Sequence, residues 1–202
     1  MEDAGTVVVW VSTFALAIAL SACAGLRAWL PLFAAGLLAR MGVAEVGEGF
    51  QWLASTPAIV CFGVATVLEI VADKVPALDH ALDTISTVIR PVAGAIVAAA
   101  VLVQFDDPLT ASVIGLLVGA PTALAPHLAK ASVRAVSTTT TAGLANPIVS
   151  TIEDGIAIAI AVLAFVIPIV LAIAILIGAL MLARWIRNRR GRAQRSAGQG
   201  LA

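Results

Sequence analysis

Two pairs of acidic residues with helical spacing stand in residues 68–91, although charged residues are scarce in the chain as a whole. Glu69 and Asp73 are one helical turn apart, and Asp79 and Asp83 repeat that spacing. Carboxylates that converge from one helix face are ligands for a hard cation such as Mg²⁺, which can in turn hold a phosphate. On an amphipathic helix at a membrane surface the same carboxylates would only be solvated. Both interpretations stay open for the second pair.

Glu69 differs from the second pair because it closes an apolar run. An ionisable group in a membrane segment indicates function, since its charged form is costly there unless a cation, a proton or a base compensates it. We therefore expect Glu69, Asp73 and Glu153 to bind a coupling proton or cation.

A second polar stretch, residues 126–141, carries bases in place of acids. At helical spacing one of its faces collects His127, Lys130, Arg134 and Thr138. We expect this basic face to meet the acidic face of residues 76–90, since opposite charges near one membrane face pair when they are partly desolvated.

Arg27 stands between two apolar runs with no acid near it in the sequence. Burying it alone would cost about 2.5–3.5 kcal/mol on insertion scales. It is therefore expected to pair with Glu69 or Glu153, or to reach the interface. Together with Lys130 and Arg134 it would neutralise an anionic solute.

The segment "STTTTAGLANPIVSTIEDG", residues 137–155, is the second candidate site. Its hydroxyls and its Asn-Pro turn predict an irregular polar break, which is tolerated at membrane depth only where protein or water satisfies the backbone. The residues of interest in this break are Thr138, Thr139, Asn146, Glu153 and Asp154. A surface loop followed by an N-capped helix, with its acids near the positive helix end, explains the segment equally well.

Apolar helices must position these groups. The chain has 202 residues, of which 61% are hydrophobic and 12% are charged. This composition lies outside the range of soluble globular proteins and predicts an all-α polytopic membrane protein, with a single helical domain over residues 1–186. The apolar runs are 7–25, 26–41, 52–72, 91–104, 109–126, 152–167 and 169–186.

Three of these runs are shorter than a full crossing requires: 26–41, 91–104 and 152–167. We therefore expect about five to seven membrane segments, including short or re-entrant helices and a break at Pro168. Amphipathic helices are predicted to begin at Pro76 and Pro126. Their similar placement after apolar runs suggests a weak internal repeat. Gly115 and Gly119 form a GxxxG packing signal.

Charge asymmetry predicts the orientation. Six of the 12 basic residues follow residue 183, so residues 1–183 carry six basic and 12 acidic groups. This favours a cytoplasmic C-terminus, with residues 187–202 as a disordered basic tail. No basic folded surface accompanies the tail, which argues against nucleic-acid binding. The chain contains no Walker loop, GxSxG or HExxH motif, which disfavours an ATP-driven protein or an enzyme of those classes.

Three segments carry a family resemblance: "SACAGLRAWLPLFAAGL", "LEIVADKVPALDHALDTI" with the following "TVIRPVAGA", and "GLANPIVSTIEDG". Together they resemble an uncharacterised bacterial family of small membrane proteins, the domain-of-unknown-function family 4126. The resemblance spans about residues 21–168 and implies a bacterial inner-membrane location. The Asp79–Asp83 spacing also resembles one Asp-rich motif of membrane prenyltransferases, although their second motif is missing.

The leading functional prediction is transport or permeation of a small polar or phosphate-bearing solute, including a lipid headgroup, by a protein embedded in the bilayer. One alternative is a Mg²⁺-dependent enzyme that acts on a lipid phosphate through Asp73, Asp79 and Asp83. Another is a non-catalytic scaffold subunit whose charges pair with one another around no cavity. The sequence identifies no cofactor, and each of these functions is compatible with a homo-oligomer.

Overall fold

The computed structural model describes residues 2–166, 181 and 184, and for residues 2–5 and 76–84 it describes the backbone alone. Residues up to Phe165 belong to one compact unit, and residues 166–202 to another. The predicted single domain over 1–186 extends beyond the described residues and stays a prediction.

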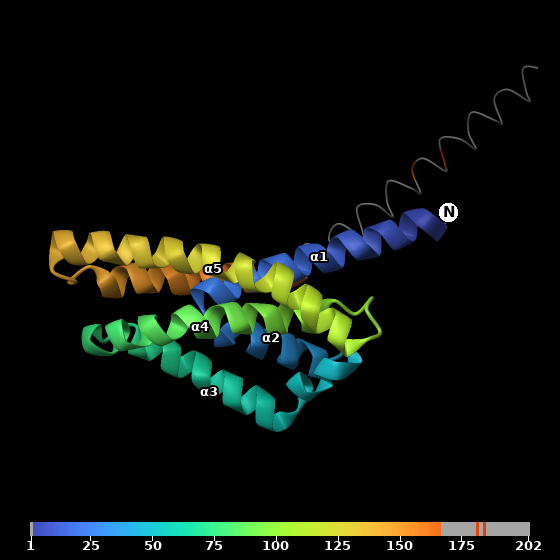
Figure 1. Cartoon of the computed structure of the whole chain (residues 1–202), viewed down its shortest axis with the longest axis horizontal. Helices are drawn as coiled ribbons and strands as arrows, with labels where there is room; N and C mark the ends of the chain where they lie inside the picture. The colour runs from blue at the N-terminus through green and yellow to red at the C-terminus, as the bar shows by residue number, and fades with distance from the viewer. Residues whose placement is uncertain (1, 167–180, 182–183, 185–202) are drawn as a thin grey trace, which may run out of the picture. The chain divides into compact units, whose positions relative to one another are not determined.

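The described residues form helices and no strand, which confirms the all-α prediction (Figure 1). The helices are α1 (Glu2–Leu26), α2 (Trp29–Arg40), the 3₁₀ helix η1 (Glu48–Ala54), α3 (Thr56–Ala72), α4 (Pro76–Val101), α5 (Pro108–Thr141) and a last helix, Asn146–Val166.

Three helical segments are long and apolar enough to cross a membrane: Thr6–Leu26, Pro108–Thr141 and Asn146–Val166. The pair η1 and α3, bent by 64°, would provide a fourth crossing. Two further apolar helices, Trp29–Arg40 and Ile85–Val101, are shorter. The chain is therefore a polytopic helical membrane protein with short segments, as expected. The run predicted as short at 152–167 is instead part of a full-length helix, because that helix already begins at Asn146.

Local sequence signals explain where several helices begin and end. The Ser55 hydroxyl caps α3 by accepting from the Ala58 N–H at 3.3 Å, and Asp107 caps α5 in the same way. Helix α5 ends at Ala142 and Gly143, whose φ angles of 51° and 83° turn the chain back into the last helix.

The two polar stretches are not separate helices, which corrects the prediction for Pro126. Pro91 lies inside α4, and Pro121 and Pro126 lie inside α5. Neighbouring helices in a membrane bundle can satisfy the backbone groups that a proline frees. At about 1.5 Å per residue, the 34 residues of α5 span about 51 Å, so its polar half continues directly from its apolar half.

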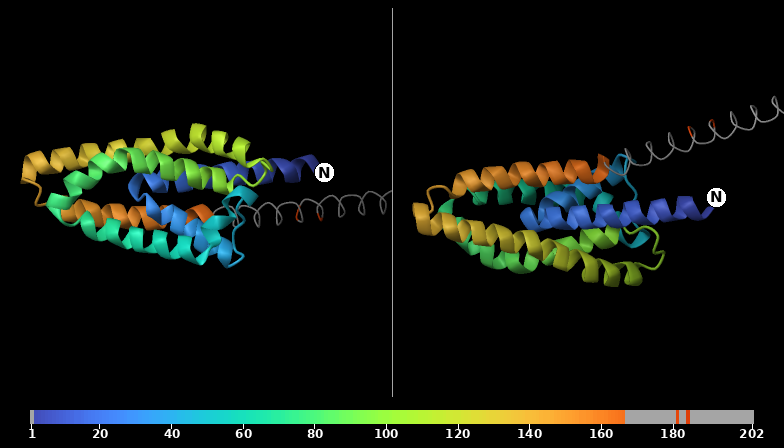
Figure 2. Two further views of the ribbon diagram at one scale, coloured as in Figure 1. Left: turned by 60° about the horizontal axis from the view of Figure 1, so that its bottom comes forward. Right: turned by 90° about the horizontal axis from the view of Figure 1, so that it is seen from above.

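Small residues allow the central helices to approach closely. Helix α4 packs along α5, and both contact α1 (Figures 1 and 2). A Cβ atom added at Gly119 would lie 2.3 Å from the Gly94 carbonyl oxygen, so these two backbones nearly touch. The GxxxG signal at Gly115 and Gly119 therefore marks the α4–α5 interface.

The α3–α4 turn and the turn between α5 and the last helix lie at the same end of the unit (Figures 1 and 2). Helix α1 stops short of that end, so the break between α1 and α2 lies among the other helices. This break positions the site.

Candidate functional site

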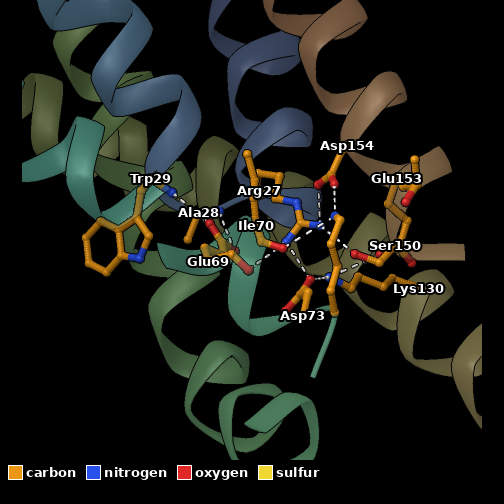
Figure 3. Close-up of polar contacts among 12 residues, drawn as sticks. Arg27, Ala28, Trp29, Glu69, Ile70, Asp73, Lys130, Ser150, Glu153 and Asp154 are labelled. Atoms are coloured by element: carbon orange, nitrogen blue, oxygen red, sulfur yellow. Dashed lines mark hydrogen bonds and ion pairs between the residues drawn. The ribbon is translucent and has the colours of Figure 1, made fainter. Parts of the chain in front are cut away.

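The site is built around the break at Arg27 and Ala28, where α1 ends and α2 begins. Helix α2 has no side-chain cap from its own N-cap residue. Glu69 of α3 supplies one, because its carboxylate accepts from the Ala28 N–H at 3.1 Å and the Trp29 N–H at 3.5 Å (Figure 3). A carboxylate at this position is favoured by the positive end of the α2 dipole.

Arg27 is fully buried, and its guanidinium contacts groups from two other helical regions (Figure 3). It forms ion pairs with Asp73 and Asp154 and donates to the Ser150 hydroxyl at 3.1 Å. The expected partners, Glu69 and Glu153, are not its ion-pair partners. The carboxylate of Glu69 faces the start of α2, and only its main-chain carbonyl accepts from Arg27, at 3.4 Å.

Asp73 binds three bases from the surrounding elements. Besides Arg27, its Oδ2 atom accepts from Lys130 Nζ at 2.8 Å and from Arg134 Nη2 at 3.1 Å. The Asp73 side chain is 3% exposed. Three cations on one buried carboxylate stabilise its ionised form, and in turn none of them is buried without an opposite charge.

Glu153 and Asp154 at the start of the last helix complete the pairing. Glu153 contacts Arg134 at 3.0 Å and Lys130 at 3.2 Å, and Asp154 contacts the partly exposed Lys74 at 2.7 Å. We call the following set the buried ion network: Arg27, Glu69, Asp73, Arg90, Lys130, Arg134, Glu153 and Asp154. Its acids and bases are equal in number.

Arg90 connects α4 to this network and was not among the predicted site residues. It is 1% exposed, donates to the Gly25 carbonyl at 2.9 Å, and lies 3.3 Å from His127 Nδ1 and 3.5 Å from Glu69 Oε1. His127 Nε2 in turn lies 3.2 Å from the Thr87 hydroxyl. The helical spacing of Thr87 and Arg90 puts both on one helix face, and this spacing was the available signal. The polar faces of α4 and α5 thus meet at these residues.

The threonine run is helical, which corrects the predicted irregular break. Thr139 is exposed and its hydroxyl donates to the Val136 carbonyl at 3.0 Å, so it does not join the network. Thr138 accepts from the amide of the buried Asn146 at 3.2 Å across the turn. Only residues 142–145 are non-helical, because the hydroxyls back-bond within α5 and do not interrupt it.

Apolar side chains cover much of the described outer surface around the buried ion network, although Lys74, which contacts Asp154, is also exposed. The side chains beside its bases and acids that face outward include Val71, Leu128, Val133, Val136, Ile148 and Ile152, each more than half exposed. Exposed hydroxyls on the same helices, those of Ser132 and Thr151, donate to carbonyls of their own helix. Charges inside and hydrocarbon outside are the arrangement expected at membrane depth.

A family comparison agrees with this membrane architecture. Residues 14–189 match the family described as Domain of unknown function (DUF4126). The chain belongs to this family. No curated protein and no solved structure matches the chain. The DUF4126 assignment confirms the resemblance seen in the sequence, and it carries no defined activity.

This DUF4126 protein contains a cavity of about 250 Å³ beside the network. Its walls come from the start of α2, one face of α3 and the facing side of α4. The residues that line it are Ala28, Trp29, Ala65, Leu68, Glu69, Ala72, Asp73, Ile85, Ser86 and Ile89. Among the described lining residues the ionisable groups are two carboxylates, and the bases Arg27, Lys130 and Arg134 that pair with Asp73 do not line the cavity.

Within the described residues, no cluster of three or more His, Cys, Asp or Glu side chains is arranged to hold a metal ion. Asp79 and Asp83 lie on α4 where only the backbone is described. The predicted Mg²⁺ site at these two residues therefore stays a prediction.

Proposed function

We propose that this protein is a transporter or permease-like protein for a small polar solute, in which Glu69 and Asp73 bind the solute or a coupling proton or cation. One observation carries the proposal: a cavity exposes two carboxylates of a buried ion network at the level of an apolar outer surface. Ionisable groups inside a membrane bundle mark solute and ion pathways in many membrane proteins.

In this mechanism the bases neutralise the acids of the network and do not bind the solute directly. Lys130 and Arg134 are both bonded to Asp73 and Glu153. A phosphate-bearing solute would have to displace one of these carboxylates before it could bind the bases. A cation or a proton needs no such displacement, because the carboxylates face the cavity directly.

A scaffold subunit is the second candidate, and the mutual pairing of the charges favours it. Pairing alone, however, does not account for the cost of the network. Replacing a buried ion network by well-packed apolar residues is often neutral or stabilising, so a purely structural role gives little reason to retain it. A scaffold also has no use for a cavity beside its ion pairs.

Uptake by the purified protein in liposomes tests the proposal. The probes are radiolabelled ethanolamine, glycerol 3-phosphate and inorganic phosphate, each with and without an imposed pH gradient. We expect at least one probe to enter faster than into empty liposomes, and Glu69→Gln to slow that entry about tenfold or more, since a hydrogen bond to a charged group contributes about 1.5–3 kcal/mol.

The matched control is Glu45→Gln, the same substitution at an exposed acid, which should leave uptake unchanged. Uptake of no probe above empty liposomes would favour the scaffold. Equal uptake by wild type and Glu69→Gln would remove Glu69 from the pathway.

We further propose that the protein resides in the bacterial inner membrane with a cytoplasmic C-terminus. The support is the positive-inside rule applied to the arginines after residue 183. A reporter that is active only in the periplasm, fused after Ala202, should stay inactive.

A further inference from the structure

The cavity beside Glu69 combines acidic groups with an apolar and aromatic wall. Apart from Glu69, Asp73 and Ser86, the described side chains that line it are apolar or aromatic. An apolar pocket with a few convergent polar groups is the usual form of a small-molecule site. The chemistry of the ligand follows from how those groups are used.

The oxygen atoms of Asp73 are used unequally. In the described part of the chain, Arg27, Lys130 and Arg134 all bond Asp73 through Oδ2. Asp73 nevertheless lines the cavity, and among the described residues no base bonds its Oδ1 atom. The ligand group that meets a carboxylate oxygen should be a cationic hydrogen-bond donor.

The ion pair between Glu69 and Arg90 is long. The two side chains are 3.5 Å apart, whereas the other ion pairs described in the network are 3.2 Å or shorter. A ligand cation can therefore compete with Arg90 for Glu69, and its binding would add one positive charge to a network whose acids and bases are equal in number. Arg90 would retain its 2.9 Å bond to the Gly25 carbonyl.

A bare inorganic cation fits this cavity poorly. Hard metal ions need about six to eight oxygen ligands, and among the described side chains that line the cavity the oxygen-bearing ones are two carboxylates and the hydroxyl of Ser86. An organic ammonium ion needs fewer oxygens, and the apolar wall can take its carbon body. Trp29 adds an aromatic ring beside Glu69 (Figure 3), which suits a cation–π contact.

The opening of the cavity indicates how the ligand arrives. Leu68 of α3 and Ile85 of α4 line the cavity and are also 62% and 54% exposed. They belong to the apolar outer surface, so the cavity opens between α3 and α4 toward the lipid. A ligand that enters there must partition into the bilayer.

From these observations we infer that the cavity binds lipophilic ammonium ions, with the ammonium group at Glu69 and Asp73 and the apolar body against Trp29 and Ile89. The inference rests on the proposed function, since it names the class of solute that the transporter takes. It also explains why two acids line the cavity and the bases that pair with Asp73 do not.

Binding of three probes of nearly equal shape to the protein in nanodiscs, measured by calorimetry, tests the inference. The probes are phenethylammonium, the neutral phenethyl alcohol and the anionic 3-phenylpropionate. We expect phenethylammonium to bind about tenfold or more tightly than the alcohol, and the anion to bind least. Equal affinities for all three probes, or tighter binding of the anion, would overturn the inference.

Variants distinguish the contribution of the Glu69 charge to binding from that of the cavity space. Glu69→Gln should weaken phenethylammonium about tenfold and leave the alcohol nearly unchanged. Ala65→Phe fills the cavity without touching an ion pair and should abolish binding of both. Trp29→Leu should weaken the cation more than the alcohol, whereas Glu45→Gln should change neither. Unchanged phenethylammonium binding in Ala65→Phe would place the site elsewhere and refute the inference.

Failure of this inference differs from failure of the proposed function. Uptake of a polar probe into liposomes without phenethylammonium binding would refute the ammonium site and keep the transporter. Phenethylammonium binding without uptake of phenethylammonium or of any polar probe into liposomes would keep the ammonium site and refute transport.

Discussion

Asp73 is the common partner of three basic side chains, which all bond to its carboxylate in a buried environment. Asp73→Asn removes the charge and leaves these bases undercompensated. Breaking a buried ion pair from one side costs about 3–5 kcal/mol, so we expect a large fall in the free energy of unfolding, measured by denaturant titration in detergent.

Asp106→Asn, the same change at an exposed acid, should have little effect. The double variant Asp73→Asn with Lys130→Met should recover part of the loss, because it removes one uncompensated base. A double variant less stable than Asp73→Asn alone would show that the charge balance is not what Asp73 provides.

Asp107 shows how an acid outside the membrane helices behaves. It directly precedes Pro108, the first residue of α5, and it is exposed. It also caps α5: the Thr110 hydroxyl donates to it at 2.6 Å and the Thr110 N–H at 2.8 Å. These bonds to Thr110 lower the pKa of Asp107 below its ordinary value of 3.8.

The lowered pKa has a defined consequence for stability. The cap contributes fully above the unfolded-state pKa of 3.8, and its contribution is lost as the pH falls through the lower folded-state value. Asp107→Ala should therefore lower the Tm at neutral pH by an amount that shrinks below about pH 3.8. A Tm difference that is constant through this range, or equal to that of Asp106→Ala, would contradict the capping role.

At the scale of the elements, the α4–α5 interface depends on glycine. A methyl group at Gly119 would meet the Gly94 carbonyl oxygen at 2.3 Å and the Ala98 Cβ at 2.8 Å. The backbone cannot give way cheaply, so Gly119→Ala should destabilise the protein by about 1–3 kcal/mol.

Gly155 in the last helix provides the matched control. A Cβ there would meet nothing within 4 Å. Gly155→Ala should therefore be neutral or stabilise the protein by up to about 1 kcal/mol through helix propensity. The comparison is made by thermal unfolding of the two variants. A Gly119→Ala variant as stable as Gly155→Ala would mean that the α4–α5 contact is looser than described.

For the whole described unit, the buried ion network should lie at membrane depth. Spin labels at Val71→Cys, Val133→Cys and Ile152→Cys, in a background with Cys23→Ala and Cys61→Ala, should be more accessible to oxygen than to a water-soluble nickel reagent in electron paramagnetic resonance. The physical reason is that these exposed apolar side chains surround the network.

A label at Glu48→Cys in η1, which is exposed beside polar neighbours, should show the opposite preference. Nickel accessibility at all three network positions would place the network in water. The charges of the network would then be solvated, and burying them would carry no large free-energy cost.

Composition and periodicity determined the class of this protein. An apolar content of 61%, gathered in long continuous runs, indicates membrane helices, which satisfy their own backbone groups inside a bilayer. The helical spacing of His127, Lys130 and Arg134 likewise placed them on one face, and all three are buried there. These properties depend on residues close in sequence, so local rules were sufficient. Asp73, Glu153 and Asp154 were also predicted as site residues, and the structure brings all three into the buried ion network, while their role stays a prediction.

Tertiary structure alone decided which charges pair. Arg27 is 46 residues from Asp73 and 123 from Ser150, and Lys130 is 57 residues from Asp73. Such contacts depend on where α1 ends and on how closely α4 approaches α5. Neither of these can be read from the separation of the residues in the sequence. Arg27 pairs with distant carboxylates, as one of the expectations had it, but with Asp73 and Asp154 and not with Glu69. The start of α2 takes the Glu69 carboxylate, because the N–H groups there would otherwise be buried without a partner.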